Sequence, residues 1–593
     1  MPQVSKEQIV DVIEDMARLL ELKGENVFKV RAYTNAARAL ETHTGDLRQA
    51  IAEGTLTEIP GIGKALAEKI TEFSNTGEVA EWNAVKAEFP PGLFEIFELQ
   101  GLGPKKIKIL WEQLGVTSIG ELKTAIEEGR LATLAGFGKK TAENMLKAIE
   151  DRTKHAGAFR FGDISAGAEL LLNELKELPD VSQVSLAGSY RRRKEVVRDL
   201  DYIVATKAPA FVSDFFVQHP LVESVIARGP TKSSVRLKNG IQADLRVVTN
   251  DQYPFALAYF TGSKEHNIAI RSRALARGWT LNEYRLEAVP QKADAKKKIE
   301  PLPIPEVHTE GELHRALGLD YIAPELREDR GEVAAAEQHT LPHLIELENL
   351  RGTFHCHTTA SDGRNTLSEM ADSARDLGLQ YLGIADHSRS SFQAHGLSIE
   401  QLLAQIEQIR ALNQTLGPEF KVFAGVECDI LKDGTLDFPD EILAQLDYVV
   451  ASIHAQFTMS EAEMTSRIIR AISSPYVTFL AHLTGRLLLT REGYQVDIPA
   501  IIDAAAQTGT VIELNSNPRR LDMDWRWWPR AREKGVRCVI NPDAHTAATI
   551  QYLYYGIGVA RKGWLTRGEV VNTLPLGKIE AELAKKRRAA GVP

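Results

Sequence analysis

Two aspartates, Asp199 and Asp201, begin an apolar run that has the composition of a strand. Because side chains alternate between the two faces of a strand, both carboxylates are expected on the same face. A third carboxylate, Asp244, lies in a later run of this kind at residues 240–248. Adjacent carboxylates repel one another unless a cation lies between them, and hard ions such as Mg²⁺ bind oxygen ligands together with substrate phosphates. The three aspartates therefore predict a two-metal site for phosphoryl transfer.

The turn before these aspartates supplies groups that bind phosphate. Gly188 and Ser189 offer backbone N–H and hydroxyl donors, and Arg191 and Arg192 add positive charge. An Asp-x-Asp pattern by itself more often marks the polar edge of a strand. Together with this turn and the third carboxylate, it favours a metal site.

Seven short apolar runs between residues 350 and 560 end in residue types that bind metals or phosphate. These ends are, in chain order, His355-Cys356-His357, Asp386-His387, Glu427, His454, His482, Asn515 and Asp543-Ala544-His545. Helical stretches separate the runs, which predicts a parallel sheet or barrel whose active site lies at the carboxyl ends of the strands. A single histidine in such a place is more often a core residue, but a ring of them predicts a multinuclear metal site.

The ligand types in this ring limit the chemistry. Imidazole and carboxylate ligands without thiolate suit Zn²⁺, Mn²⁺ or Fe²⁺. His355 and His357 are expected on one face of their strand, with Cys356 on the other. Such a cluster lowers the pKa of a bound water and holds a phosphate, so the predicted reaction is phosphoester hydrolysis.

The first 150 residues are predicted to be helical, with apolar positions at helical spacing from residue 6 to residue 22. They contain a weak repeat, apolar-x-Gly-apolar-Gly followed by a lysine-bearing helix start. Its three glycine pairs are Gly61 and Gly63, Gly101 and Gly103, and Gly136 and Gly138. Glycine lets the backbone approach a phosphate, and the helix N-terminus supplies free N–H groups. One copy would be as well explained by a glycine-capped helix pair, whereas three copies favour helix-hairpin-helix motifs that bind the DNA backbone.

The length and composition of the chain are those of a multidomain globular protein. Its 593 residues suffice for about four domains of ~150 residues. Its three cysteines have no paired spacing, which suggests a reducing compartment. No apolar run is long enough for a membrane span and no signal-peptide pattern begins the chain, so we expect a cytoplasmic protein without a membrane partner. The net charge of −9 does not favour nucleic-acid binding, although an average can hide local basic patches.

The pattern Gly-Ser-Tyr-Arg-Arg…Asp-x-Asp resembles the nucleotidyltransferase palm of the family X DNA polymerases, which include vertebrate polymerase beta. The resemblance implies two catalytic ions, Mg²⁺ or Mn²⁺, on Asp199, Asp201 and Asp244. It also implies nucleotide binding by Gly188, Ser189 and Arg192. The chain departs from the family at Arg193 and Arg198, where glycine is common.

A second stretch, Tyr-Phe-Thr-Gly-Ser-Lys-Glu-His-Asn at residues 259–267, resembles the nucleotide pocket of the same family. In isolation it would be interpreted as a buried aromatic pair at a turn. The resemblance implies sugar discrimination by Tyr259, Phe260 and Gly262, a base-edge contact by Asn267, and a template contact by Arg271.

The first glycine repeat is similar to the amino-terminal domain of polymerase beta. That similarity implies that Lys69 is a Schiff-base lysine for removal of a 5′ deoxyribose phosphate, and that Lys29 and Tyr33 hold the 5′ phosphate. A second lysine of the family is replaced by Ala65. A phosphate-binding or solvated role for Lys69 remains an equal alternative.

The strand-end motifs of the second half resemble those of the polymerase and histidinol phosphatase (PHP) domain. They include His-x-His-Thr-x-x-Ser-Asp-Gly, Gly-Val-Glu, Ser-Ile-His and Asn-Pro-Asp-Ala-His. The resemblance implies up to three ions, Zn²⁺ or Mn²⁺. Nine positions match its trinuclear ligand pattern: His355, His357, Asp362, His387, Glu427, His454, His482, Asp543 and His545.

Together the resemblances cover nearly the whole chain and match the bacterial-type family X DNA polymerases. They imply a helical N-terminal region with helix-hairpin-helix motifs, an α/β nucleotidyltransferase palm with a thumb, and a distorted (β/α)7 barrel. The expected domains are an N-terminal helical domain at 1–84, a fingers-like domain at 85–152, the palm at 153–258, the thumb at 259–327, a linker at 328–349 and the PHP domain at 350–593.

The implied function is a DNA-directed DNA polymerase that fills short gaps during base excision repair. The PHP domain would add a 3′→5′ exonuclease, 3′-end-processing or abasic-site endonuclease activity. The expected partners are gapped or nicked duplex DNA and deoxynucleoside triphosphates, bound by a monomer. Two alternatives are a DNA-end-binding scaffold whose metal cluster is structural, and a polymerase joined to a small-molecule phosphatase.

Overall fold

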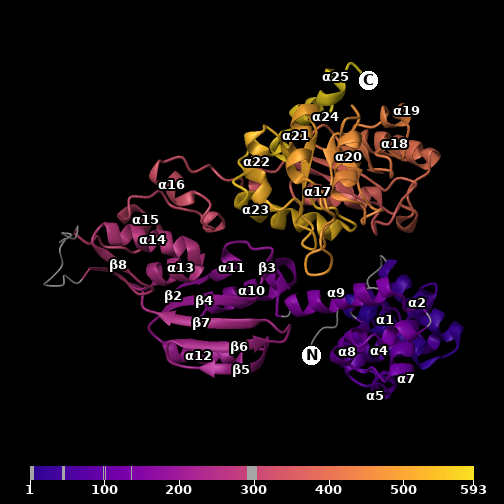
Figure 1. Ribbon diagram of the computed structural model, residues 1–593, viewed down its shortest axis with the longest axis horizontal. Coiled ribbons are helices and arrows are strands. Elements are labelled where there is room, and N and C mark those ends of the chain that lie inside the picture. Colours follow the sequence, from indigo (N-terminus) through magenta and orange to yellow (C-terminus); the bar gives the residue numbers. More distant parts are fainter. Residues whose placement is uncertain are drawn as a thin grey trace. The chain divides into compact units, whose positions relative to one another are not determined.

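The computed structural model describes residues 6–42, 47–97, 99, 102–134, 136–155, 157–289 and 303–592. It divides into two compact units, Met1–Ala156 and Gly157–Pro593 (Figure 1). Gly101 and the lysine-rich residues 292–298 lie outside the described ranges. Within those ranges, no helix combines the length and the hydrophobicity that a bilayer span requires.

The first unit is helical throughout its described residues. Ile9, Ile13, Met16 and Leu20 are buried, which is the apolar face expected from their spacing. The helices are α1 (Lys6–Lys23), α2 (Val27–Thr42), α3 (Leu47–Glu53), η1 (Leu56–Glu58), α4 (Lys64–Thr76), α5 (Ala80–Ala87), α6 (Gly92–Phe97), α7 (Pro104–Leu114), α8 (Ile119–Glu127), η2 (Arg130–Thr133) and α9 (Lys139–His155).

The second unit begins with a five-stranded mixed sheet in the order β2-β4-β7-β6-β5, drawn as one layer in Figure 1. Only β4 and β7 run parallel to each other within this sheet, and the other pairs are antiparallel. The elements are β1 (Phe159–Arg160), α10 (Phe161–Lys176), β2 (Val181–Leu186), α11 (Gly188–Arg191), β3 (Val196–Val197), β4 (Asp199–Thr206), α12 (Pro209–Gln218), β5 (Val222–Arg228), β6 (Lys232–Leu237) and β7 (Gln242–Val248).

The predicted thumb packs against this sheet through a buried ion cluster. Glu310 accepts hydrogen bonds from Arg191 at 2.6 Å and from Arg327 at 2.8 Å. Burial alone would raise the pKa of Glu310, but the two guanidinium groups hold it well below its usual range. The elements are α13 (Tyr253–Thr261), α14 (Lys264–Ala276), β8 (Trp279–Leu281), β9 (Leu286–Ala288), α15 (Glu310–Ala316), η3 (Pro324–Leu326), α16 (Glu332–Glu337) and η4 (Leu347–Asn349).

The rest of the unit forms a seven-stranded parallel sheet whose strands follow chain order. The first strand also lies beside the last, because the Asn572 side chain donates to the carbonyl oxygens of Gly352 and Ile540, and Cys356 bridges to Ala544. This nearly closed arrangement confirms the predicted barrel. Its strands are β10 (Gly352–Cys356), β11 (Tyr381–Ile384), β12 (Lys421–Asp429), β13 (Tyr448–Ser452), β14 (Phe479–Leu480), β15 (Val511–Asn515) and β16 (Cys538–Asn541).

Helices surround the barrel (Figure 1). They are α17 (Leu367–Asp376), η5 (Phe392–Ala394), α18 (Ile399–Asn413), α19 (Asp440–Leu443), α20 (Glu461–Ile472), α21 (Ile498–Thr508), η6 (Trp525–Trp527), α22 (Trp528–Glu533), η7 (Ala547–Tyr552), α23 (Leu553–Lys562), η8 (Val571–Thr573), α24 (Leu576–Leu583) and α25 (Lys585–Ala589).

The barrel has two apolar clusters, as expected when both faces of its strands are buried. One cluster contains the large aromatic rings of Phe354, Tyr381, Phe423, Tyr448 and Phe479. The other contains side chains that pack against the surrounding helices.

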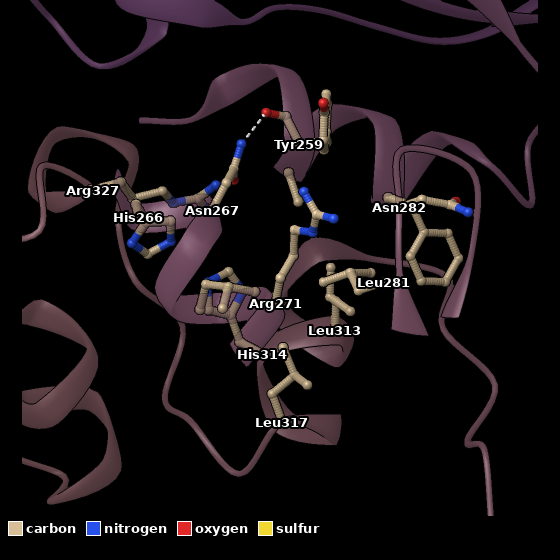
Figure 2. Close-up of a pocket in the computed structure, with 13 residues that line it drawn as sticks. Tyr259, His266, Asn267, Arg271, Leu281, Asn282, Leu313, His314, Leu317 and Arg327 are labelled. Atoms are coloured by element: carbon tan, nitrogen blue, oxygen red, sulfur yellow. Dashed lines mark hydrogen bonds between the residues drawn. The ribbon is translucent and has the colours of Figure 1, made fainter. Parts of the chain in front are cut away.

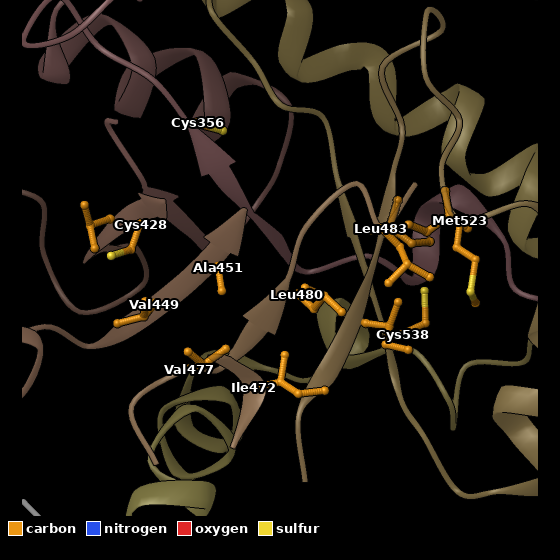
Figure 3. Close-up of a cluster of buried hydrophobic side chains, with 14 of the residues drawn as sticks. Cys356, Cys428, Val449, Ala451, Ile472, Val477, Leu480, Leu483, Met523 and Cys538 are labelled. Atoms are coloured by element: carbon orange, nitrogen blue, oxygen red, sulfur yellow. The ribbon is translucent and has the colours of Figure 1, made fainter. Parts of the chain in front are cut away.

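All three cysteines of the chain lie in the second cluster. Figure 3 shows Cys356, Cys428 and Cys538 among its apolar side chains. Burial raises the pKa of the Cys428 thiol to about 12 and raises those of Cys356 and Cys538 well above their usual range. The thiols are therefore protonated and enclosed.

Candidate functional sites

The three palm aspartates lie on the two parallel strands of the sheet. Asp201 on β4 is the direct register partner of Asp244 on β7. Burial, and then the charges of Asp199 and Asp244, raise the pKa of Asp201 to about 7. The carboxylates thus face one another closely enough to repel, as the alternation of side chains predicted. A like-charged group of this kind fits a divalent cation.

Asp244 differs from the other two because a lysine compensates its charge. Lys232 Nζ lies 2.7 Å from Asp244 Oδ2, and Gln242 donates to the other oxygen at 3.0 Å. Burial would raise the pKa of Asp244, yet the contacts with Lys232, Ser234 and Gln242 lower it. Lys232 was not singled out from the sequence, because a lysine at the start of a strand usually has no such role.

The turn before β4 lies against the aspartates. Gly188 has a φ of +60°, and a Cβ there would come within 2.5 Å of Asp201 Oδ2. Only glycine meets both conditions, so the turn that presents Ser189 is fixed close to the carboxylate. Arg191 contacts Glu310 of the thumb, while Arg192 Nε contacts Glu328 Oε1 at 3.0 Å and its Nη1 donates to the Thr261 carbonyl.

The residues of the predicted nucleotide pocket are brought together by α13 and α14. Tyr259, Asn267 and Arg271 line one pocket, which is shown in Figure 2. Asn267 Nδ2 donates to the Tyr259 carbonyl at 2.7 Å. Gly262 lies beside Arg192, because a Cβ at Gly262 would be 3.0 Å from Arg192 Nη1. The Phe260 ring lies edge-to-face with the Tyr259 ring, at a centroid distance of 5.1 Å, and stacks beneath the Arg246 guanidinium at 4.0 Å.

The glycine turns of the first unit have the predicted geometry where they are described. Gly63 and Gly103 are the N-caps of α4 and α7, and Gly138 directly precedes α9. A Cβ at any of these three would meet no atom within 4 Å, so the backbone there is open to an approaching phosphate. Gly61 and Gly136 adopt φ values of +98° and +86° in the preceding turns.

Lys69 and Tyr33 lie together, but Lys29 does not join them. Lys69 Nζ is 2.7 Å from Glu81 Oε1 and 3.3 Å from the Tyr33 hydroxyl. Burial would lower the pKa of Lys69, but Glu81 and Tyr33 raise it above its ordinary value. Lys29 instead pairs with Glu25 at 3.5 Å on the surface.

All nine predicted ligands of the second half meet at one end of the barrel. Their ligand atoms fall into four overlapping sets, and within each set all atoms lie within 4.8 Å of one another. Among the described residues, the palm aspartates do not form such a set. The four sets are His357, Asp362, His387 and His545; His355, Glu427 and His482; His355, His357 and Asp543; and His387, Glu427 and His454.

Simple alternation along β10 does not by itself bring His355 and His357 together. The register with β11 shifts by one residue between Thr353 and Cys356, and His355 has a φ of +57°. Because of this bulge, Phe354 lies with the aromatic rings while Cys356 lies in the other cluster. The strand ends before His357, whose ring centroid is 5.3 Å from that of His355. The expected placement of Cys356 is correct, but its cause is a bulge.

Glu427 lies at the centre of the cluster. Its oxygens are 2.9–3.2 Å from ring nitrogens of four histidines, which are His355, His387, His454 and His482. Burial would raise the pKa of Glu427, but the histidines hold it well below its usual range. Both ring nitrogens of His357 and the Nδ1 of His482 are buried without a hydrogen-bond partner. Buried unpaired nitrogens beside ionised carboxylates fit divalent cations.

Further groups behind the ligands fix their orientation. Glu513 Oε2 is 2.7 Å from His355 Nδ1, and Asp429 Oδ1 is 2.6 Å from His454 Nδ1. Arg520 Nε is 3.2 Å from Asp543 Oδ2. Asn515, at a predicted strand end, is fully buried and donates to Glu513 and Asp543. Such contacts select the imidazole tautomer and raise ligand basicity.

An exposed phenylalanine lies beside this cluster. Phe392 is 85% exposed and begins η5, which follows the ligand His387 in the chain. The loop is held firmly, because Ser390 and Ser391 each donate to Asp429 Oδ2 at 2.7 Å. Ser391 Oγ also lies 3.3 Å from His454 Nδ1, so the residue directly before Phe392 contacts a histidine of the cluster.

Comparison with known proteins agrees with this arrangement. Family models match for a helix-hairpin-helix domain at residues 5–79, a SAM-like helix-hairpin-helix tandem at 95–151, a DNA polymerase beta thumb at 256–328 and a PHP domain at 353–517.

Two kinds of relative were found. The DNA polymerase/3′-5′ exonuclease PolX of Bacillus subtilis (strain 168) is 39% identical over 582 residues, which are 98% of this chain and 99% of that protein. A probable phosphatase of Thermoanaerobacter sp. (strain X514) is 30% identical over 249 residues, which are 40% of this chain and 96% of that protein. A probable phosphatase of Caldanaerobacter subterraneus is 29% identical over 250 residues, with 40% and 92% coverage.

Proposed function

Because the chain belongs to the family X DNA polymerases that carry a C-terminal PHP domain, we propose that it extends DNA 3′ ends at the palm and removes nucleotides from 3′ ends at the PHP cluster. The observation that carries this proposal is the presence of two separate, complete sets of ligand residues in one chain. The nine PHP positions form close sets that fit divalent cations, the mutual repulsion of the palm aspartates fits such cations too, and this family depends on them.

At the palm, Asp199, Asp201 and Asp244 would hold two ions, Mg²⁺ or Mn²⁺. When bound, such ions neutralise the triphosphate and the developing charge of the reaction. Gly188, Ser189 and Arg192 would orient the triphosphate. Asp244, kept ionised beside Lys232, would assist the primer 3′ hydroxyl.

The pocket of α13 and α14 would select the nucleotide. Tyr259 and Gly262 would lie against the sugar, Asn267 at the base edge and Arg271 at the template. Phe260 would support this wall from behind through its stack with Arg246.

At the PHP cluster the nine ligands would hold up to three ions, Zn²⁺ or Mn²⁺. Such a site supplies a water of lowered pKa and a clamp for the phosphate. Glu427 would supply carboxylate oxygens to these ions, and Glu513 and Asp429 would keep His355 and His454 oriented. Phe392 favours DNA as the substrate, because an exposed ring on a fixed loop can stack on a base.

The phosphatase relatives favour a second candidate, hydrolysis of small phosphate monoesters by the same cluster. Cleavage at an abasic site would use the same ions, but it would break a phosphodiester within the DNA strand and not at its 3′ end. Comparison of DNA with a monoester substrate separates 3′ shortening from phosphatase activity, and a duplex with an internal abasic site tests abasic-site cleavage.

The first unit would bind the DNA backbone through its glycine turns. We propose gapped or nicked duplexes as the substrate, short-gap filling in base excision repair as the role, and a cytoplasmic monomer as the working form. Lys69 would remove a 5′ deoxyribose phosphate only after Glu81 moves away, because this contact raises its pKa. We propose the domain division given by the sequence: an N-terminal helical domain at 1–84, a fingers-like domain at 85–152, the palm at 153–258, the thumb at 259–327, a linker at 328–349 and the PHP domain at 350–593.

The test uses end-labelled one-nucleotide-gapped and recessed duplexes with Mg²⁺ or Mn²⁺, with and without nucleotides. We expect extension with nucleotides and stepwise 3′ shortening without them. p-Nitrophenyl phosphate is the matched monoester substrate. Faster turnover of the monoester than of DNA would favour the phosphatase, and DNA binding without either reaction would favour the scaffold.

A further inference from the structure

Helix α23 of the PHP region packs one face against the palm. Tyr554, Gly558 and Lys562 are four residues apart and therefore lie on one side of the helix. Gly558 faces the Arg193 side chain, to which a Cβ there would approach within 3.2 Å. Tyr555 extends the contact, because its hydroxyl is 3.1 Å from Ser165 Oγ on α10.

The contacts of Arg193 account for one departure of this chain from its family, in which glycine is common at this position. Its φ of +54° lies in the left-handed region, which favours glycine. The arginine side chain nevertheless has a clear partner: its guanidinium lies 4.5 Å from the Tyr554 ring and 5.1 Å from the Phe161 ring, and it donates to the Tyr554 hydroxyl. The unfavourable backbone is thus offset by a contact between palm and PHP region.

Lys562, at the end of the same helix, reaches the nucleotide-binding loop. Its side chain is fully buried, and its Nζ donates to Glu328 Oε1 and, at 3.1 Å, to the carbonyl of Arg192. Glu328 in turn accepts from Arg192 Nε at 3.0 Å and lies 3.4 Å from Lys194. One lysine therefore holds Arg192 at both its backbone and, through Glu328, its guanidinium.

The charges in this group support one another. Burial lowers the pKa of Lys562 to about 8, and Glu328 and Glu195 oppose this shift, so the ammonium still persists at neutral pH. Burial would raise the pKa of Glu328, but Lys562, Arg192 and Lys194 lower it to about 2. A buried ion group of this kind depends on every member, because removal of one leaves the others uncompensated.

We propose that Lys562 is a positioning residue of the polymerase site, which fixes Arg192 for the nucleotide triphosphate through Glu328. The proposal rests on the polymerase function proposed above. It makes a helix of the PHP region part of the nucleotidyltransferase site, about 370 residues away in sequence.

The test is steady-state incorporation of one nucleotide by the full chain carrying Lys562→Met. We expect the KM for the nucleotide to rise about tenfold, while the KM for DNA and the 3′ shortening activity stay unchanged. Lys562→Arg should restore much of the nucleotide affinity. Arg561→Met is the matched control, because Arg561 lies on the same helix as Lys562 and contacts Glu325 and Glu346 but neither Arg192 nor Glu328.

A second variant shows whether the effect passes through Glu328. In a Glu328→Gln background, Lys562→Met should change the nucleotide KM by much less than tenfold. Equal effects in both backgrounds would overturn the proposed route. An unchanged nucleotide KM in Lys562→Met, with wild type active, would overturn the proposal itself, whereas an inactive wild type would overturn the proposed function.

Should Lys562→Met fail to fold, Arg193→Gly tests the neighbouring contact of α23 with the same loop, through Tyr554, and relieves the backbone strain at residue 193. We expect a smaller rise in the nucleotide KM and unchanged 3′ shortening. No change in either KM would then count against coupling between α23 and the nucleotide loop.

Discussion

Asp201 in the palm and Glu427 in the PHP barrel are carboxylates on strands of two sheets, yet their pKa values shift in opposite directions. Burial and two neighbouring aspartates raise the pKa of Asp201 to about 7. Four histidines hold that of Glu427 well below its usual range, despite complete burial. The palm site is therefore a group of like charges, and the PHP site is a group of opposite charges.

This difference in charge predicts when each site binds its ions. The palm aspartates repel one another, and we expect cations to join them together with the nucleotide. The PHP ligands already lie within 4.8 Å of one another and are oriented by Glu513 and Asp429. We expect exchangeable ions in the palm and resident ions in the barrel.

The largest expected effect is a reciprocal loss of activity. Asp201→Asn should reduce extension at least about a thousandfold, because several kcal/mol of charge stabilisation are lost. His357→Ala should reduce 3′ shortening by a similar factor, because His357 belongs to two of the four ligand sets. Each variant should retain the other activity, as measured on labelled recessed duplexes. Loss of both activities in either variant would mean that the two sites are not independent.

Removal of metal should lower the stability of the PHP barrel but not that of the palm. If resident ions are bound at about a thousand times their Kd, chelation costs the barrel about 4 kcal/mol of unfolding free energy. Hydrogen exchange should then speed up in β12 and β13 and remain unchanged in β4 and β7. Equal acceleration in both sheets would contradict the distinction between resident and exchangeable ions.

A smaller effect is expected from a residue behind the ligands. Glu513→Gln should weaken metal binding and 3′ shortening about 10–100-fold, because His355 loses its carboxylate partner. Extension should not change. Asp447→Asn is the control, since Asp447 is a largely buried carboxylate of the same barrel that accepts from the Ala424 backbone. Metal titration followed by calorimetry measures the difference.

The smallest effect concerns substrate recognition. Phe392→Ala should raise the KM for single-stranded 3′ ends about fivefold, which corresponds to ~1 kcal/mol of base stacking. Hydrolysis of bis-p-nitrophenyl phosphate should stay the same, and Phe392→Trp should retain DNA affinity. An equal loss on both substrates would show that Phe392 supports the cluster and does not stack on DNA.

Features that follow from a repeat or from the alternation of side chains along a strand could be predicted from the sequence. Strand alternation placed Asp199 and Asp201 together, and strand ends identified eight of the nine residues of the PHP cluster, to which the PHP resemblance added Asp362. A second strand-like run at residues 240–248 supplied Asp244 as the third carboxylate, and the register between Asp201 and Asp244 agrees with this. In each case a short local pattern carries the information.

Other features depend on contacts that no local pattern records. The bulge at His355 arises from pairing with β11. Glu513 stands in an otherwise apolar strand, and that unusual position was the available sign of its contact with His355. Lys562 ends an ordinary amphipathic helix, and its contact with Arg192 follows only from the packing of distant segments.

The three buried cysteines have a practical consequence for experiments on this chain. Their enclosed, protonated thiols should not react with maleimide dyes in the folded protein. A cysteine introduced at an exposed position would then be the reactive thiol, without removal of the native ones. Pairs of fluorophores can therefore be placed on the helical unit and on the barrel to follow a DNA end as it passes from synthesis to trimming.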